Sequence, residues 1–253
     1  SRGSDGATWV FTCAEQEQSI RVRGNLAVDN SLMLIQALLR HQGLGLIPRA
    51  MVEDELARGE LVTLLGRNGS GRSTTLRAIM NMVGRRTGSI VVNGNETIGM
   101  PAHQIPRLGV GYCPEERGIF ASLTTEENLE LPPVLRPGGL SIAEIYELFP
   151  NLLARRSSPG TKLSGGEQQM LAIARILRTG AKLLLLDEIS EGLAPVIVQT
   201  LARTIRTLRE RGFTIVMVEQ NFRFAAPLAD RFYVMEHGRI VEGFSAAELD
   251  AKM

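Results

Sequence analysis

The chain has 253 residues, a formal net charge of +1 and 44% hydrophobic residues, which suits one large domain or two small ones with a sizeable core. The near-neutral charge argues against binding to nucleic acid or anionic lipid through bulk electrostatics. No run of about 18 apolar residues occurs, and the first six residues are not followed by the apolar h-region of a signal peptide, so we expect neither a membrane-spanning helix nor a signal peptide.

The first sixty residues predict short, mixed elements. Residues 1–8 are expected to be a loosely held start. Alternating apolar and polar side chains predict a strand over residues 20–28. Ser31 is a plausible N-cap for a helix that ends near Gly43. A short strand over 44–47 and a short helix over 50–58 follow.

From Glu60 the pattern becomes that of a parallel α/β sheet. A buried strand over 61–65 leads into a glycine-rich loop and then a helix from Ser73 to about Met82. The further elements expected are a strand pair within 89–98, a strand over 109–113, helical segments within 124–158, a helix over 166–179, a strand over 182–186, a helix over 196–211, a strand over 214–218 and a hairpin centred on His237-Gly238.

The cysteines and histidines predict no metal site. Cys13 and Cys113 match neither metal-ligand spacing nor a disulfide framework, so we interpret them as ordinary thiols in a reducing, cytosolic compartment. The three histidines, His41, His103 and His237, do not cluster in the sequence.

The glycine-rich loop has the spacing of a P-loop, in which backbone N–H groups wrap a phosphate and the helix N-terminus adds positive charge. Ser73 would supply a hydroxyl to Mg²⁺. Arg72 stands where the pattern has Lys, so a planar fork replaces a point charge. Taken alone, the loop could be an ordinary turn between strand and helix. The predicted phosphate-binding residues are Gly66, Arg67, Asn68, Gly69, Ser70, Gly71, Arg72, Ser73 and Thr74.

An apolar strand then delivers two carboxylates, Asp187 and Glu188, to its C-terminal end, where α/β sheets bind ligands. Asp187 is placed to hold Mg²⁺, and Glu188 to polarise an attacking water as general base. A buried strand that ends in acids is common, so this pattern alone is weak.

The run Leu163-Ser164-Gly165-Gly166-Glu167-Gln168-Gln169 resembles the signature sequence of ABC ATPases. Physically it is a second anion cradle at a helix N-terminus. The resemblance implies that Ser164, Gly165, Gly166 and Glu167 close on the ATP held by a partner subunit. It also implies ATP and Mg²⁺ as cofactors, and a membrane permease as a further partner.

Three further positions are interpreted from this resemblance. Ser190-Glu191-Gly192-Leu193 falls at the D-loop, which crosses the dimer interface. Gln220 stands where most members carry the switch histidine, and Glu115 where most carry the Q-loop glutamine. Gln220 is expected to contact the γ-phosphate as part of the catalytic set. Glu115 is expected near the metal with Ser73 and Asp187.

Both departures resemble one subfamily, the second ATPase of branched-chain amino acid importers. The runs that match are Pro114-Glu115, Glu191-Gly192-Leu193-Ala194-Pro195 and Val218-Glu219-Gln220-Asn221. Some branches of these importers take up urea or short amides. Ile189 replaces the proline usual after the Asp-Glu pair.

Residues 9–59 resemble instead the C-terminal part of the effector-binding domain of LysR-type regulators. The resembling pieces are Trp9-Val10-Phe11, the strand over 20–28, Leu44-Gly45-Leu46-Ile47-Pro48 and the run from Glu55 to Val62. The strands that precede the P-loop in ABC ATPases, with their adenine-stacking aromatic residue, are absent from the sequence. We therefore interpret the chain as a chimera, with residues 1–58 as the regulator-like fragment and 59–253 as the nucleotide-binding domain.

The sequence thus predicts an α/β P-loop fold, with a mostly parallel sheet, a helical arm and a foreign N-terminal segment. The predicted function is the ATP-binding and hydrolysing subunit of an ABC importer, peripheral on the inner face of the cell membrane. Three alternatives remain: a nucleotide-binding module that hydrolyses poorly, a small-molecule-sensing regulator built on residues 9–59, and a non-functional chimera.

Overall fold

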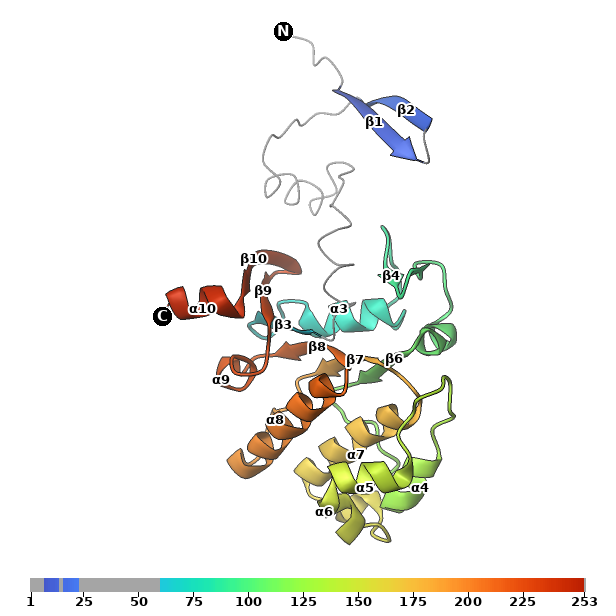
Figure 1. Cartoon of the computed structure of the whole chain (residues 1–253), viewed down its shortest axis with the longest axis vertical. Helices are drawn as coiled ribbons and strands as arrows, with labels where there is room; N and C mark the ends of the chain where they lie inside the picture. The colour runs from blue at the N-terminus through green and yellow to red at the C-terminus, as the bar shows by residue number, and fades with distance from the viewer. Residues whose placement is uncertain (1–6, 14–15, 23–59, 253) are drawn as a thin grey trace. The chain divides into compact units, whose positions relative to one another are not determined.

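The computed structural model describes residues 7–13, 16–22 and 60–252 (Figure 1). The chain divides into two compact units, Ser1–Glu53 and Asp54–Met253. In the first unit the described part is an antiparallel hairpin of β1 (Ala7–Cys13) and β2 (Gln16–Val22), paired from Ala7–Val22 to Cys13–Gln16.

The expectations for the N-terminal segment are only partly tested. Ala7 and Thr8 belong to β1, so this end of the expected loose start is a strand. β2 begins before the expected strand over 20–28 and overlaps it through Val22. The helices expected within 31–43 and 50–58, and the strand over 44–47, lie outside the described residues.

The second unit is built on a six-stranded sheet in the order β10-β9-β3-β8-β7-β6, in which only the β9–β10 pair is antiparallel. Its strands are β3 (Leu61–Gly66), β6 (Val110–Cys113), β7 (Leu183–Asp187), β8 (Thr214–Glu219), β9 (Arg231–Glu236) and β10 (Arg239–Ser245). A separate short hairpin pairs β4 (Val91–Val92) with β5 (Asn95–Glu96). The expected α/β fold with a mostly parallel sheet is confirmed.

Alternate residues of each central strand serve the two faces of the sheet, as the two-residue period of a strand requires. On β7, Leu184 and Leu186 join one core cluster while Leu183 and Leu185 join the other. The larger cluster packs under α7 (Gly165–Arg178) and α8 (Pro195–Glu210), and the smaller one under α3 (Arg72–Ile79). Figure 1 shows α3 on one side of the sheet and α7 and α8 on the other.

The expected helical arm consists of α4 (Thr125–Glu130), α5 (Ile142–Leu148) and α6 (Pro150–Ala154). Thr124 and Ser141 each close a capping box with a glutamate three residues later, so the sequence itself marks where α4 and α5 begin. α4 packs on α7.

The remaining described helices are short. They are η1 (Ala102–Leu108), η2 (Gly160–Lys162), α9 (Phe222–Ala225) and α10 (Ala246–Lys252). The predicted bounds of α3 were wrong at its end, because Asn81 adopts a positive φ of 54° and the helix stops at Ile79.

Candidate functional site

The glycine-rich loop joins the end of β3 at Gly66 to the start of α3 at Arg72. Gly69 and Gly71 have φ angles of 78° and 102°, which favour glycine. A Cβ at Gly66 would lie 2.5 Å from the carbonyl oxygen of Met235. The β9–β10 turn braces the loop, because the Gly238 N–H donates to the Ser70 carbonyl at 2.7 Å. The loop shape is therefore fixed by a strand far away in the sequence.

The residues of this loop fit a phosphate. The Ser70 hydroxyl oxygen is buried and has no hydrogen-bond partner within the described part of the chain, which is costly for a polar group unless a ligand or water completes it. The N-terminal amides of α3 lie in the same loop, with the positive end of the helix dipole.

Arg72 is turned into the loop rather than toward solvent. Its side chain is only 3% exposed and forms an ion pair with Glu188 at 2.6 Å. The same guanidinium donates to the carbonyls of Gly66 and Glu219, the latter at 3.1 Å, and to Asn68 Oδ1 at 3.4 Å. The P-loop cation is thus held by protein oxygen atoms.

Asp187 is fully buried at the end of β7. Its Oδ1 accepts a hydrogen bond from the Ser73 hydroxyl at 2.8 Å, and its Oδ2 accepts one from the Tyr112 hydroxyl at 3.0 Å. Burial raises the pKa of Tyr112 to about 12; Arg77 opposes this rise and Asp187 adds to it, so the hydroxyl stays a donor. A hydroxyl beside a carboxylate is an oxygen donor pair of the kind that Mg²⁺ prefers.

The predicted metal set is only partly brought together. Glu115 follows β6 and is exposed. It lies close enough to Glu188 for its charge to raise the pKa of Glu188. Within the described residues no group of three or more His, Cys, Asp or Glu side chains could hold a metal ion by itself. Ser73 and Asp187 are thus the pair in direct contact.

Glu188 lies one residue beyond β7 and has a positive φ of 47°. Burial raises its pKa to about 7, a hydrogen bond with Glu191 adds to the rise, and the charge of Arg72 opposes it. A carboxyl group with a pKa near neutrality is suited to proton transfer.

The signature segment begins α7 with a complete capping box. Ser164 Oγ accepts from the Glu167 N–H at 3.3 Å, and Glu167 Oε2 accepts from the Ser164 N–H at 2.7 Å. A Cβ at Gly166 would lie 2.5 Å from Ile197 Cγ2 on α8, so glycine permits close packing of the two helices. Arg117, in the segment after Glu115, donates to Gln168 at 3.1 Å and links that segment to α7.

Gln220 is exposed and directly follows β8, the strand that pairs with β7. Parallel pairing aligns Asp187 with Val218, so Glu188 and Gln220 leave the same edge of the sheet. The P-loop leaves that edge from β3, the neighbour of β8 on its other side.

Sequence reasoning missed Tyr112 and gave no role to Glu219. Tyr112 could have been found, because it stands two residues before Pro114 on the strand that pairs with β7. Glu219 is 2% exposed and accepts hydrogen bonds from Ser190. Glu219 lay inside a run that the resemblance had already singled out, but a contact with Ser190 has no signature in the sequence.

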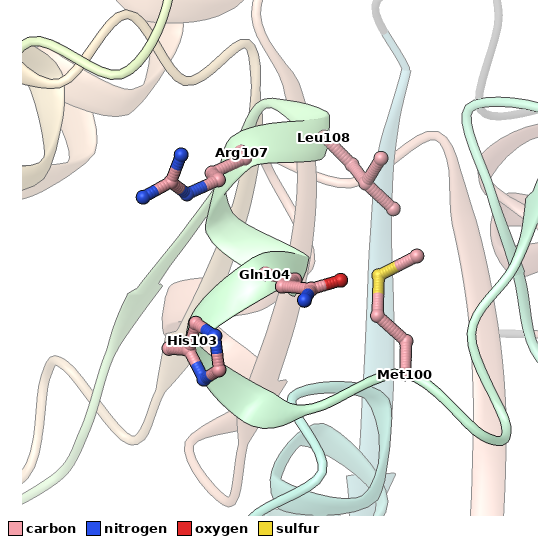
Figure 2. A pocket seen from close by; sticks show the side chains of 5 residues that line it. All are labelled: Met100, His103, Gln104, Arg107 and Leu108. Carbon is pink, nitrogen blue, oxygen red and sulfur yellow. The ribbon is translucent and has the colours of Figure 1, made fainter.

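Two surface hollows lie away from these residues. One is lined by residues of η1 and the turn before it, namely Met100, His103, Gln104, Arg107 and Leu108 (Figure 2). The other lies between α8 and α9. Neither contains a predicted site residue, so the candidate site is the sheet edge that holds the P-loop.

Comparison with known proteins agrees with this geometry. Residues 51–191 match the family described as "ABC transporter", and residues 1–81 match the "LysR substrate binding domain". The chain is 44% identical over 201 residues to the high-affinity branched-chain amino acid transport ATP-binding protein BraG of Pseudomonas aeruginosa, covering 78% of this chain and 86% of BraG. It is 32% identical to the lipopolysaccharide export system ATP-binding protein LptB of Escherichia coli, covering 79% and 87%.

Among solved structures, a dimeric ATP-binding cassette in a post-hydrolysis state with ADP and phosphate superposes with a TM-score of 0.65. Its sequence identity is 19%, and the match covers 96% of this chain and 97% of that one. Within the described residues, none of the helices is both long enough and apolar enough to cross a membrane.

Proposed function

The chain belongs to the ATP-binding subunits of ABC transporters, and from that premise we propose that it binds and hydrolyses ATP to drive an importer of branched-chain amino acids. The substrate class rests on the 44% identity to BraG, which exceeds the 32% identity to the export protein LptB. The resemblance of the runs around Glu115, Gly192 and Gln220 favours the same subfamily.

One observation carries the ATPase proposal. Two successive residues of the P-loop contact two successive carboxylates where β7 ends: Arg72 pairs with Glu188, and Ser73 with Asp187. The predicted phosphate loop, the candidate metal-binding carboxylate and the candidate general base therefore meet at one sheet edge, which is the arrangement that phosphoryl transfer needs.

The residues of this chain divide the reaction between them. The backbone from Gly66 to Thr74 would hold the phosphates of ATP, and Ser73 and Asp187 would hold Mg²⁺ with Glu115 nearby. When bound, Mg²⁺ neutralises charge on the phosphates. Glu188 would accept a proton from the attacking water, and Gln220 would donate a hydrogen bond to the γ-phosphate, without the charge change that a histidine allows.

The signature cradle supports a dimer. The predicted anion cradle, made of Ser164, Gly165, Gly166 and Glu167, lies at the N-terminus of α7, separate from the P-loop. We propose that it closes on the nucleotide of a second ATPase subunit, and that the pair works on permease subunits at the inner face of the cell membrane. In the same proposal, residues 59–253 form the ATPase domain and residues 1–58 contribute no regulatory activity.

The decisive experiment is Mg²⁺-dependent phosphate release by the purified chain beside a Glu188→Gln variant. Wild-type release that the substitution abolishes is expected, because an amide cannot accept the proton of the attacking water. Equal release by both proteins would remove Glu188 from its proposed role.

A second candidate function is a nucleotide-binding module that hydrolyses poorly. The observation that favours it is the buried pair of Arg72 with Glu188, because the general base is engaged by the P-loop side chain itself. Retained ATP binding with no phosphate release in either protein would support this candidate over the importer ATPase.

A further inference from the structure

Glu219 is a buried carboxylate at the last position of β8. Its Oε1 accepts from the Ser190 N–H at 3.1 Å and its Oε2 accepts from the Ser190 hydroxyl at 2.9 Å. The backbone N–H of Asn221 also donates to it. One side chain therefore holds both the segment after β7 and the segment after β8.

The contacts begin where the backbone ladder ends. Asp187 is paired with Val218, and the Glu188 N–H donates to the Val218 carbonyl at 2.9 Å. Beyond this point the two segments diverge toward the D-loop and toward Gln220. Past the last backbone hydrogen bond between the strands, the Glu219 side chain connects the two segments by binding Ser190, two residues after Glu188.

A closed ring of contacts results. The Glu219 carbonyl accepts from Arg72 Nη1 at 3.1 Å, and Arg72 Nη2 pairs with Glu188 at 2.6 Å. Glu188 is two residues from Ser190, whose amide and hydroxyl bind the Glu219 carboxylate. The ring joins the P-loop, the candidate general base and the start of the D-loop through one residue.

The carboxylate is an unusual choice for a purely structural role. Within the described residues Glu219 forms no ion pair. Burial raises its pKa to about 7, against the hydrogen bonds from Ser190 and Asn221, and the negative charge of Glu188 adds to the rise. A buried charge without a cation is costly, so an apolar residue would stabilise this strand end better if packing were its only task.

We propose that Glu219 is a positioning residue, which holds the loop from Glu188 to Leu193 and the loop at Gln220 in one geometry and so sets the turnover number of the ATPase. This inference rests on the proposed hydrolytic function. Glu219 does not reach the nucleotide in this scheme, so nucleotide affinity should depend on it little.

The test combines substitutions at both ends of the contact. Glu219→Leu removes the acceptors at similar volume, and we expect kcat to fall about tenfold with the Kd for ATP changed less than about threefold. Tenfold corresponds to about 1.4 kcal/mol, which is of the size of one net intramolecular hydrogen bond. Glu219→Gln keeps one acceptor and should retain about a third of kcat or more. Ser190→Ala should lower kcat, and the double variant with Glu219→Leu should be no slower than Glu219→Leu alone.

The matched control is Thr204→Val, which removes a buried hydroxyl from α8 whose bond to the Thr200 carbonyl is internal to the helix. Its kcat should equal that of the wild type. The inference would be overturned if kcat fell only in proportion to the melting temperature, and by the same amount in the Leu and Gln variants. Glu219 would then be a stabilising residue alone.

Hydrogen exchange separates this inference from the ATPase proposal. If the wild type shows no release that depends on Glu188, the ATPase proposal fails on its own. The positioning role then stands if Glu219→Leu speeds exchange of the amides over 189–193 and 220–221 about tenfold while those of β7 and β8 are unchanged. Unchanged exchange in those loops would contradict it.

Discussion

At the scale of single residues, Arg72 is the position where this site departs most from the usual P-loop. A planar guanidinium can bind several acceptors at once, which a compact ammonium cannot do in the same geometry. Here it binds the carbonyls of Gly66 and Glu219 as well as Glu188. Nucleotide binding has to compete with these contacts.

Arg72→Lys should therefore activate the enzyme. We expect tighter ATP binding and faster phosphate release, because replacing the guanidinium frees Glu188. Each change should be about tenfold, which corresponds to about 1.4 kcal/mol. Both constants can be measured by nucleotide titration and steady-state release. An unchanged or slower Arg72→Lys variant would show that the arginine is itself adapted to the phosphates.

The buried Glu219 should make the stability of the fold decrease as the pH rises. Its pKa rises from 4.5 to about 7 on folding because it is buried, so the folded state binds the proton more tightly. Proton binding by Glu219 therefore contributes to the free energy of unfolding. The contribution is fully present below pH 4.5 and is lost as the pH rises through about 7, by at most about 3 kcal/mol.

Relative to Glu219→Gln, the wild type should thus lose melting temperature between pH 5 and pH 8. Thr204→Val has no titratable change and should run parallel to the wild type over this range. A constant difference between the wild type and Glu219→Gln at every pH would refute the burial of an ionisable carboxyl.

At the scale of elements, the start of α7 depends on α8. The sequence specifies the cap, since Ser164 and Glu167 satisfy each other's backbone N–H groups. The position of that cap is set by the close approach of Gly166 to Ile197. The signature cradle is thus local in its chemistry and tertiary in its placement.

Gly166→Ala should lower the melting temperature by several degrees, because overpacking of a helix contact costs about 1–3 kcal/mol. Combining it with Ile197→Ala should restore part of the loss. Gly165→Ala is a matched control for stability, since its Cβ would meet only the flexible end of Arg117 at 3.4 Å. Equal melting temperatures for the two single variants would contradict the packing explanation.

At the scale of the whole molecule, two family models match adjoining parts of one chain. The regulator-like match covers residues 1–81 and the transporter match covers 51–191, so the two overlap around the start of β3. From the sequence we predict that the strands preceding the P-loop in ABC ATPases, with their adenine-stacking aromatic residue, are replaced here by the regulator-like segment.

Replacing residues 1–58 with ordinary ABC N-terminal strands should tighten ATP binding by about tenfold to a hundredfold, as expected for about 1–3 kcal/mol of base stacking. Equilibrium titration with ATP measures this. The same titration with a nucleoside-free ligand such as tripolyphosphate should show no gain. Equal ATP affinity in both chains would mean that the present N-terminal segment already serves the base.

By itself, the sequence determined the features that depend on short, local motifs. The P-loop glycines, the strand that ends in Asp187 and Glu188, and the capped signature at Ser164 are short motifs, so they predicted the fold and the family. It could not show the engagement of Arg72 with Glu188, the hydroxyl of Tyr112 on Asp187 or the ring through Glu219 and Ser190. Those contacts join residues on different strands, and only parallel pairing of β3, β8, β7 and β6 brings their carboxyl ends to one edge.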